Sequence, residues 1–458
     1  MIKTIIANGK TEYEVLAGLA GRGDAPGADV EEAVRKIVED VRTEGDAAVV
    51  RYTLRFDGPD AAPDGKIGTL TRKELKEAFE SLDKPLADAI LHSAENIRSY
   101  HKKQADSLNG YEEKSADGVV RGQMLRGLER VGVYVPGGTA AYPSTVLMDV
   151  IPAKLAGVGE IVMVTPPRRG KAGDKEGCAA GEGIGEVTSA DGGFATDAAI
   201  LGAAYIAGVD RVLLAGGGQA VAALAYGTET FPRVDKIVGP GNIYVATAKR
   251  LLYGVVDIEM IAGPSEILII ADESADAAFA AADLLSQAEH DPLSASILLT
   301  TDPDVAAAAA RQVVTQLKSL DRAYTAQDSL SKNGLIIVCR SEDEMVSLAN
   351  HIAPEHLEIL TADPFALLTR IKNAGSVFLG PWTPEPVGDY YAGTNHVLPT
   401  GGAARFASPL GVYDFVKRTS YTHYPKDVLL RAKDDIIAIA EAEGLTAHAQ
   451  AVKIRFNE

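Results

Sequence analysis

The sequence predicts an α/β protein with two Rossmann-like domains, each built on an open parallel sheet. Short apolar runs that are typical of buried strands alternate with longer segments whose apolar residues recur at helical spacing. The alternation occurs in two separate series along the chain. Because short strands joined through helices form parallel sheets, each series is expected to form a sheet of its own.

The N-terminal region, residues 1–133, is predicted to be mainly helical. Three of its segments place apolar residues every three to four positions among charged residues: VEEAVRKIVEDVRTEGDAAVVRYTLRF, TRKELKEAFESL and PLADAILHSAENIRSYHKK. Each helix therefore has an apolar face that must be covered by another part of the protein. We expect this region to pack on the second α/β domain.

The first α/β series, residues 134–262, contains three glycine-rich turns directly after predicted strands. They are Gly137-Gly138 after VYVP, Gly216-Gly217-Gly218 after RVLLA, and GPGN at 239–242 after KIV. Such a turn leaves backbone N–H groups free to bind a phosphate, and open sheets bind ligands at this edge. None has the G-x-G-x-x-G spacing, so each alone could be an ordinary tight turn. Together they favour a dinucleotide-sized ligand. A polar, glycine-rich segment at 168–193 is expected to be a flexible surface loop.

The second series, residues 263–410, begins at EILIIAD and continues through an Ala-rich helix to the runs SASILLTTD and GLIIVC. Its last part, GDYYAGTNHVLPTGGAARF, is a loop rich in glycine and tyrosine. The remaining residues, 411–458, are predicted to form a helical tail, in which Gly444 ends the segment DVLLRAKDDIIAIAEAEG. The chain is thus expected to contain four regions.

Composition and charge exclude several classes of protein. Of the 458 residues, 46% are hydrophobic and 24% charged, as in ordinary globular proteins. The net charge of -18 disfavours binding to nucleic acid or to an anionic membrane. It is compatible with a cationic small substrate, or with a role in solubility alone. Two cysteines, Cys178 and Cys339, are too few for a disulfide framework or a thiolate zinc site. With neither a signal-peptide core nor an apolar run of about 18 residues, the protein is expected to be cytoplasmic.

Several side chains suggest a metal and acid/base site. Gln287 and His290 lie three positions apart near the end of the Ala-rich helix, so they share one face. Gln is a rare zinc ligand, and a surface or capping role is the alternative. Glu355 and His356 follow Pro354, which we interpret as the first position of a helix, where the dipole would keep His356 neutral. An ordinary acidic first turn is the competing interpretation.

Loop and tail residues extend this list. Asp389 and His396 occur in the glycine-rich loop, which suits a binding site better than a core. Glu443 lies in the last turn before Gly444, where a carboxylate faces an unfavourable dipole. His448 opens a short following helix, where a neutral imidazole is favoured.

Over residues 29–455 the sequence closely resembles the histidinol dehydrogenase family, the zinc- and NAD-dependent enzymes of the last two oxidations in histidine biosynthesis. The resemblance rests on segments in the family's order: VGVYVPGGTAAYPSTVLM, GGGQAVAALAYGTE, KIVGPGNIYVATAKR, IAGPSEILIIAD, LSQAEH, APEHLEI, TPEPVGDYYAGTNHVLPTGGAARF and LTAH. It implies oxidation of L-histidinol to L-histidine through histidinal, with two NAD consumed. It also implies a homodimer in which the C-terminal tail crosses to the partner subunit.

Carried over to this sequence, the resemblance implies a role for each matching residue. Zinc would be held by Gln287, His290, Asp389 and, from the tail of the other subunit, His448. Glu355 and His356 match the family's acid/base pair. The substrate would contact the zinc ligands and His356, together with Ser144, Ser265, His396 and Glu443. The cofactor would contact Tyr134, Gln219 and Asn242.

Two departures from the family pattern and two rival functions remain. The segment at 168–193 is longer than the family usually carries, and Glu259 stands where an Asp is common, with little expected effect. A non-catalytic nucleotide- or metal-binding protein on the same scaffold should have lost the chemistry-bearing residues, yet these match. An enzyme for another amino alcohol or a sulfonate should differ at His396, Glu443 and His448, and these match the histidinol pattern as well.

Overall fold

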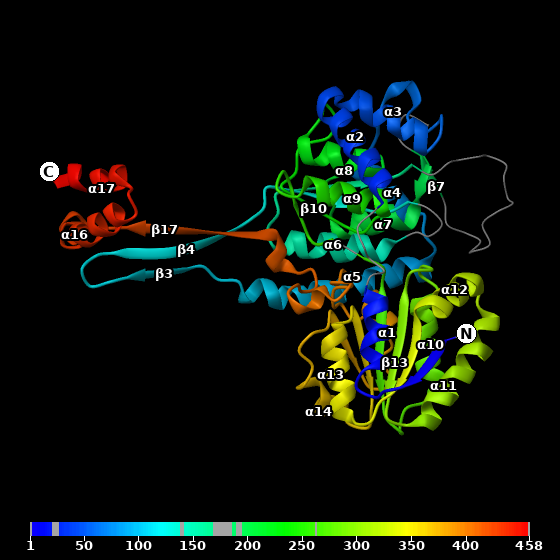
Figure 1. Cartoon of the computed structure of the whole chain (residues 1–458). Coiled ribbons are helices and arrows are strands. Elements are labelled where there is room, and N and C mark those ends of the chain that lie inside the picture. Colours follow the sequence, from blue (N-terminus) through cyan, green and yellow to red (C-terminus); the bar gives the residue numbers. More distant parts are fainter. Residues whose placement is uncertain are drawn as a thin grey trace.

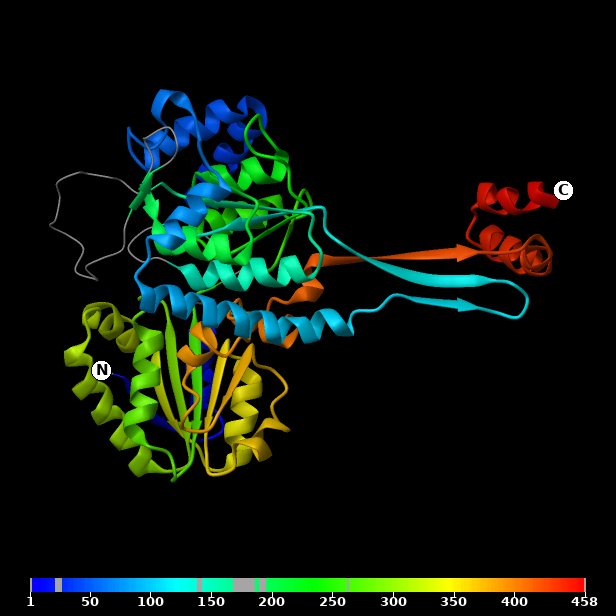
Figure 2. The same ribbon diagram turned by 180° about the vertical axis from the view of Figure 1, so that it is seen from behind.

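The computed structural model describes residues 2–20, 27–137, 142–167, 186–188, 195–261 and 263–456. It contains two six-stranded sheets flanked by helices, and a long arm that projects away from both (Figures 1 and 2). Most of the segment at 168–193, including Cys178, and part of the Gly137-Gly138 turn lie outside the described residues. Residues within the described part form no helix that is both long and apolar enough to cross a membrane.

The first sheet confirms the expected parallel architecture of the first α/β series. Its strand order is β11-β10-β5-β6-β9-β2, with β2 alone antiparallel to its neighbour. The strands are β2 (Gly68–Leu70), β5 (Arg130–Tyr134), β6 (Glu160–Thr165), β9 (Arg211–Leu214), β10 (Lys236–Val238) and β11 (Asp257–Ile258). The helices of this series are α6 (Pro143–Leu155), α7 (Ala198–Ala207), α8 (Gly217–Tyr226) and α9 (Ile243–Leu252). A short hairpin, β7 (Glu186–Thr188) with β8 (Ala195–Asp197), precedes α7.

The second sheet is parallel throughout, in the order β1-β14-β13-β12-β15-β16. Its strands are β1 (Lys3–Ile6), β12 (Glu266–Ala271), β13 (Ala295–Thr300), β14 (Gly334–Val338), β15 (His356–Leu360) and β16 (Ser376–Leu379). The accompanying helices are α1 (Thr11–Ala20), α10 (Ala277–Ala288), α11 (Pro303–Gln316), α12 (Ala323–Asn333), α13 (Glu342–Ile352), α14 (Pro364–Leu368) and α15 (Glu385–Tyr390). Every residue of β12, β13 and β15 is buried, as expected for strands that helices cover on both faces.

The N-terminal helices are present, but the expected packing on the second domain is wrong for most of them. They are α2 (Ala28–Glu44), α3 (Asp46–Phe56), α4 (Arg72–Glu80) and α5 (Lys84–Ser107). Helix α2 packs on α8 and α9, α3 on α8, and α4 on α7, all in the first domain. Val34 and Val41 of α2 belong to the same apolar core as the buried residues of α8. The apolar face of α2 is therefore covered by the first domain. Among the described N-terminal elements, β1 and α1 belong to the second domain, and α5 contacts it through Asn96, whose side chain donates to the Tyr391 carbonyl at 2.7 Å. The 133/134 boundary falls inside β5.

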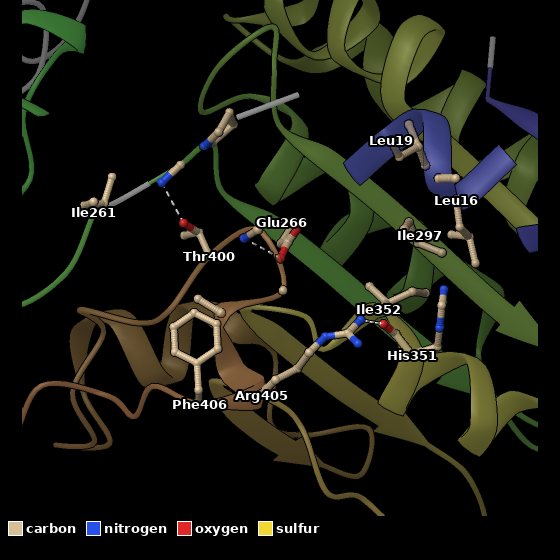
Figure 3. Close-up of a pocket in the computed structure, with 16 residues that line it drawn as sticks. Leu16, Leu19, Ile261, Glu266, Ile297, His351, Ile352, Thr400, Arg405 and Phe406 are labelled. Atoms are coloured by element: carbon tan, nitrogen blue, oxygen red, sulfur yellow. Dashed lines mark hydrogen bonds between the residues drawn. The ribbon is translucent and has the colours of Figure 1, made fainter. Parts of the chain in front are cut away.

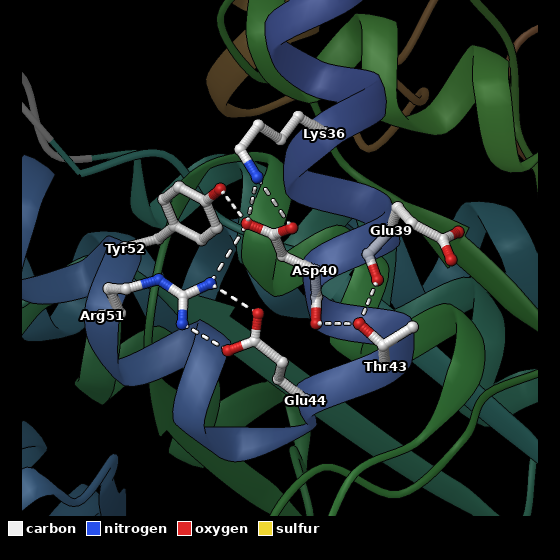
Figure 4. Close-up of polar contacts among 7 residues, drawn as sticks. All are labelled: Lys36, Glu39, Asp40, Thr43, Glu44, Arg51 and Tyr52. Carbon is white, nitrogen blue, oxygen red and sulfur yellow. Dashed lines mark hydrogen bonds and ion pairs between the residues drawn. The ribbon is translucent and has the colours of Figure 1, made fainter.

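A polar cluster joins α2 to α3 (Figure 4). The Asp40 carboxylate accepts hydrogen bonds from Lys36, from the Tyr52 hydroxyl at 2.6 Å and from Arg51 at 3.1 Å. Arg51 also pairs with Glu44. The cluster thus links two helices that both pack on α8.

The arm differs from the helical tail that the sequence predicted. It is a three-stranded antiparallel sheet of β3 (Tyr111–Lys114), β4 (Val120–Gly127) and β17 (Val416–His423), which carries α16 (Lys426–Ala442) and α17 (Thr446–Lys453) at its far end. Its strand residues are mostly exposed, so they show no apolar alternation from which strands could have been predicted. The two terminal helices are confirmed.

Candidate active site

The structure gathers most of the predicted site residues at the amino-terminal edge of the second sheet. Ser265 directly precedes β12, and Glu355 and His356 lie at the start of β15, which pairs with β12 in parallel. Gln287 and His290 lie at the end of α10. Asp389 lies on α15 and His396 in the loop after it. The neighbouring ends of β12 and β15 thus bring together Glu266, Glu355 and His356, although Glu266 precedes the other two by 89 and 90 positions.

Glu355 and His356 do not begin a helix, so that prediction is wrong. Helix α13 ends at Ala353, whose φ of 53° is left-handed, and Pro354 follows it as prolines commonly follow helix ends. His356 is already the first residue of β15, because HLEIL supplies the apolar side chains of a central buried strand. The neutrality expected of His356 consequently needs another cause than a helix dipole.

One residue of β12 holds both members of the acid/base pair. The backbone N–H of Glu266 donates to Glu355 Oε2 at 2.9 Å, and the backbone carbonyl of Glu266 lies 3.1 Å from His356 Nδ1. A carbonyl only accepts, so Nδ1 carries the proton and Nε2 presents its lone pair. Nε2 faces Glu385 Oε1 at 3.7 Å and has no hydrogen-bond partner among the described residues.

Burial sets the protonation of this pair. Desolvation, helped by the charges of Glu266 and Asp389, raises the pKa of Glu355 to about 8, although hydrogen bonds from the Glu266 backbone and the Ser265 side chain oppose it. Desolvation lowers the pKa of His356, which outweighs the opposing charge of Asp389. A carboxyl whose pKa lies near neutral pH, beside an uncharged imidazole, is suited to transfer protons at ordinary pH.

Asp389 is the ionised carboxylate of the cluster. Burial acts to raise its pKa, but the hydrogen bond and charge of His396, whose Nδ1 lies 3.6 Å from Asp389 Oδ1, contribute to lowering it to about 2. Glu385, one helical turn earlier on α15, shows the opposite behaviour. Desolvation and the negative charge of Asp389 raise the pKa of Glu385 to about 10, so it is protonated at neutral pH.

Gln287 and His290 bring nitrogen and oxygen donors to the same place. Gln287 is 1% exposed, and neither its amide oxygen nor its amide nitrogen has a hydrogen-bond partner in the described parts of the chain. Burying an unsatisfied amide is costly, so a ligand for this group is expected. Desolvation lowers the pKa of His290, whose imidazole also senses the charges of Asp389 and His356. A neutral His290 is therefore available as a metal ligand.

A further grouping of metal-compatible side chains overlaps this set. One ligand atom each from His356, Glu385 and Asp389 lies within 4.8 Å of the others. Glu385 is a site residue that the sequence reasoning missed. Its signal was present: Glu385 and Asp389 are four positions apart in PEPVGD, which places both on one face of a helix.

A cavity of about 610 Å³ adjoins the cluster (Figure 3). Glu266, which holds the acid/base pair, lies in its wall, with Ile261 and Phe406 on one side and Leu16 and Leu19 of α1 on the other. Thr400 accepts a hydrogen bond from the backbone of Gly263 at 2.6 Å in the same wall. The Glu266 side chain accepts a hydrogen bond of 3.1 Å from the backbone of Gly401, so the residue that holds Glu355 and His356 is itself held by the loop after α15.

The predicted cofactor residues lie at the carboxyl edge of the first sheet. Tyr134 ends β5, and its hydroxyl accepts a hydrogen bond from the Gly217 backbone at 3.1 Å. Gln219, in the first turn of α8, is 1% exposed and both its amide atoms lack a partner within the described residues. Asn242 caps α9, its side-chain oxygen accepting from the backbone of Tyr244 and Val245. The two glycine turns at 216–218 and 239–242 therefore follow strands and precede helices, as predicted.

Two predicted substrate residues lie apart from the cluster in this chain, and a third, Ser144, lies at its border. Glu443 and His448 are exposed at the far end of the arm. Ser144 lies in the first turn of α6, two residues after Tyr142, whose charge contributes to the raised pKa of Tyr390 beside Asp389. The start of α6 thus borders the cluster, whereas the arm is remote from it.

Comparison with known proteins identifies the family. The family model described as histidinol dehydrogenase matches residues 21–195 and 177–456. The histidinol dehydrogenase of Bacillus thuringiensis subsp. konkukian is 49% identical over 429 residues, which cover 94% of this chain and 93% of the relative. That of Lactococcus lactis subsp. lactis is 45% identical over 459 residues, covering 100% of both chains.

The chain belongs to the histidinol dehydrogenase family. The crystal structure of histidinol dehydrogenase from Elizabethkingia anophelis has the same fold, with a TM-score of 0.86 and 36% identity, covering 99% of this chain and 98% of the other. The resemblance predicted from the sequence is confirmed. The chain is thus an oxidoreductase of a family that catalyses the final steps of histidine biosynthesis through histidinal.

Proposed function

We propose that this protein is an NAD- and zinc-dependent homodimer that converts L-histidinol, two NAD+ and one water into L-histidine, two NADH and protons. The observation that carries the proposal is the attachment of Glu355 and His356 to the backbone of Glu266. It leaves a neutral imidazole nitrogen directed toward Asp389 and Glu385, beside donors suited to a metal ion. An oriented base next to a cation site is the arrangement that oxidation of an amino alcohol requires.

The donors fit zinc. We propose Gln287, His290 and Asp389 of this chain as three of the ligands, since the set offers an unpartnered amide, a neutral imidazole and an ionised carboxylate. Glu385 fits this role less well because it is protonated and interacts with Asp389. Bound zinc would orient the amine and imidazole of histidinol and would not need to ionise its alcohol.

The fourth proposed ligand, His448, comes from the partner subunit. Residues Glu443 and His448 lie on an arm far from their own cluster, and helices α16 and α17 bury few side chains of their own. Leu430 and Ile439 of α16 are 47% and 63% exposed, and Ile454, directly after α17, is 63% exposed. Such an apolar surface at the end of a projecting arm fits a protein partner. We propose that it places Glu443 and His448 against the partner's cluster, where Glu443 and His396 hold the imidazole and amino ends of the substrate.

In the first oxidation, His356 Nε2 removes the proton of the hydroxyl group as hydride leaves the carbinol carbon, giving histidinal. Throughout this step Nδ1 keeps its proton and donates it in a hydrogen bond to the Glu266 carbonyl. The imidazole therefore becomes positively charged without changing its orientation. NAD+, when bound, accepts the hydride in each step. Ser265, which interacts with Glu355, and Ser144 at the start of α6 would contact the substrate.

In the second oxidation, Glu355 in its carboxylate form takes a proton from water as the water oxygen bonds to the aldehyde carbon. His356 returns the proton that it gained in the first oxidation to the aldehyde oxygen, which gives the hydrate and makes Nε2 a free base again. His356 then accepts the proton of the resulting hydrate as the second hydride leaves, which gives the acid. A Glu355 pKa of about 8 makes it a stronger base than an ordinary carboxylate. Tyr134, Gln219 and Asn242 would contact the dinucleotide, for which the unpartnered Gln219 amide offers a donor and an acceptor.

Mixed dimers test both the activity and the shared site. NADH formation from histidinol, compared with other amino alcohols, measures the activity. His356→Asn and His448→Ala chains, each inactive alone, are unfolded together, refolded and assayed. If the arm crosses, the hybrid has one site with both defects and one with neither, so activity returns. If each site uses its own arm, no activity returns. Wild-type protein without NADH formation from histidinol would overturn the proposed activity itself.

A further inference from the structure

A second pair of buried carboxyls lies behind the candidate metal site. Asp283 is 8% exposed and Glu358 is fully buried. Their side chains interact with each other, Asp283 from α10 and Glu358 from β15. Glu358 Oε1 also accepts a hydrogen bond of 2.8 Å from the backbone N–H of Glu385, the first residue of α15. One side chain therefore connects three elements.

Each of these three elements also carries a residue of the candidate site, close to the group that takes part in the buried carboxyl contacts. On β15, His356 and Glu358 are two positions apart, so both side chains point to the same side of the sheet. On α10, Asp283 and Gln287 are four positions apart and share one helix face. On α15, the Glu385 amide begins the turn that ends at Asp389. On the strand and on both helices, the residue of the buried pair or its partner therefore lies one structural repeat away from a site residue.

The pKa shifts of the pair indicate which carboxyl is protonated. Desolvation, followed by the interaction with Asp283, raises the pKa of Glu358. Desolvation also raises the pKa of Asp283 to about 6, whereas the interaction with Glu358 acts in the opposite direction. Glu358 is thus the member that holds the proton. Its Oε1 accepts from the Glu385 backbone, and its Oε2 is buried with no hydrogen-bond partner among the described residues, although the side chain interacts with that of Asp283.

We propose that Asp283 and Glu358 are positioning residues that fix α10 and α15 against β15, so that Gln287, His290 and Asp389 converge on one divalent ion. The proposal rests on the zinc site proposed above. Residues that orient metal ligands commonly change metal affinity or activity by about 10- to 100-fold when they are replaced. Asp283 and Glu358 need not touch the substrate or the ion to have this effect.

The test compares two double variants of matched size. Asp283→Asn with Glu358→Gln keeps an acceptor for the Glu385 N–H and a polar side chain at both positions. Asp283→Leu with Glu358→Met keeps the volume but removes the hydrogen bond to Glu385 and the polar interaction of the pair. Zinc affinity of each metal-free full-length protein is measured by competition with a chromophoric chelator. The absorption spectrum of the Co2+-loaded protein reports the ligand geometry.

The amide variant is expected to bind zinc as the wild type does, with an unchanged cobalt spectrum. The apolar variant should lose about 10- to 100-fold in zinc affinity and show an altered spectrum. Since apolar replacement of buried ionisable groups is often neutral or stabilising, its thermal unfolding temperature should not fall in parallel. Equal zinc affinity and spectra for the two variants would overturn the proposal.

Two further outcomes are also decisive. Should the apolar double variant fail to fold, Asp283→Ala is compared with Asp283→Asn in the same assay, and equal zinc affinities would overturn the proposal. Wild-type protein that binds no zinc would contradict the proposed metal site itself, which distinguishes that failure from a failure of the positioning role.

Discussion

The imidazole of His356 is oriented by the backbone carbonyl of Glu266, 3.1 Å from Nδ1. This contact decides which ring nitrogen can act as a base, because the nitrogen that binds a carbonyl must carry the proton. The same residue donates its N–H to Glu355. The chemistry proposed for the site therefore depends on the position of the first residue of β12, where the strand pairing with β15 fixes both partners.

Replacing His356 by Asn should block both oxidations while substrate binding survives. The variant loses the base but keeps a side chain that can contact the Glu266 carbonyl, and general-base catalysis contributes about 10²- to 10⁴-fold. Single-turnover NADH formation from histidinol and from histidinal measures the two steps separately. His92→Asn, an exposed histidine on α5, serves as the control and should be unaffected. Wild-type turnover of either substrate by His356→Asn would contradict the assignment.

Glu355→Gln should slow the aldehyde oxidation more than the alcohol oxidation. The amide preserves an acceptor for the Glu266 N–H but cannot take a proton from water. Rapid-mixing assays that begin from each substrate should show the larger loss with histidinal. The exposed Glu273→Gln is the matched control. A larger loss with histidinol would remove the water-activating role from Glu355.

The pH dependence of stability should reveal the raised pKa of Glu355. The folded, metal-free protein keeps this carboxyl protonated up to about pH 8, whereas the unfolded chain releases the proton near the ordinary glutamate pKa of 4.5. Between these two pH values the folded state binds more protons than the unfolded state. The contribution of Glu355 to stability is therefore fully present below pH 4.5 and is lost as the pH rises to 8. For one such group the slope approaches about 1.4 kcal/mol per pH unit.

The neutral histidines act in another range, since lowered pKa values of His290 and His356 reduce stability as pH falls below 6.5. The difference in unfolding free energy between wild type and Glu355→Gln, measured by urea denaturation, isolates the carboxyl. Relative to wild type, the variant should gain stability as pH rises from 5 to 8. A difference that is constant over this range would show that burial leaves Glu355 with an ordinary pKa.

The buried ion pair of Lys249 and Glu259 should support the cofactor side of the enzyme. Lys249 Nζ lies 2.6 Å from both oxygens of Glu259, and Glu259 accepts from the backbone of Gly239 in the GPGN turn. Lys249→Met leaves a buried carboxylate unpaired, at a cost of about 3–5 kcal/mol, and should weaken NAD binding. Lys332→Met, which breaks an exposed pair, should cost at most about 1 kcal/mol. Denaturant unfolding and NAD titration of both variants check this.

Much of the fold could be predicted because the buried strands are nearly continuous apolar runs, such as EILIIA and ASILLT. The packing of α2 could not be predicted, because its apolar face fits any apolar partner, and the covering surface is chosen by tertiary structure. The arm was missed for the opposite reason: an exposed sheet such as YEEK carries no burial pattern.

The candidate site shows the same division. Sequence spacing could place Gln287 and His290 near the end of one helix, although His290 lies in the turn after α10. Only the parallel pairing of β12 and β15 places Glu266 against both Glu355 and His356. Pro354 was misread as a helix start because proline is favoured both at the first turn and after a helix end. The spacing of four between Glu385 and Asp389 also predicts that the two carboxyls share one helix face, and this signal was missed.

Anomalous diffraction from crystals soaked with zinc and histidinol tests the central claim most directly. The proposed function predicts one zinc peak, bound by Gln287, His290 and Asp389 with His448 of the partner subunit, and contacting the substrate's nitrogen atoms. A peak held instead by His356, Glu385 and Asp389 would occupy the proposed base and contradict the mechanism. The absence of a peak at saturating zinc would contradict the metal site altogether.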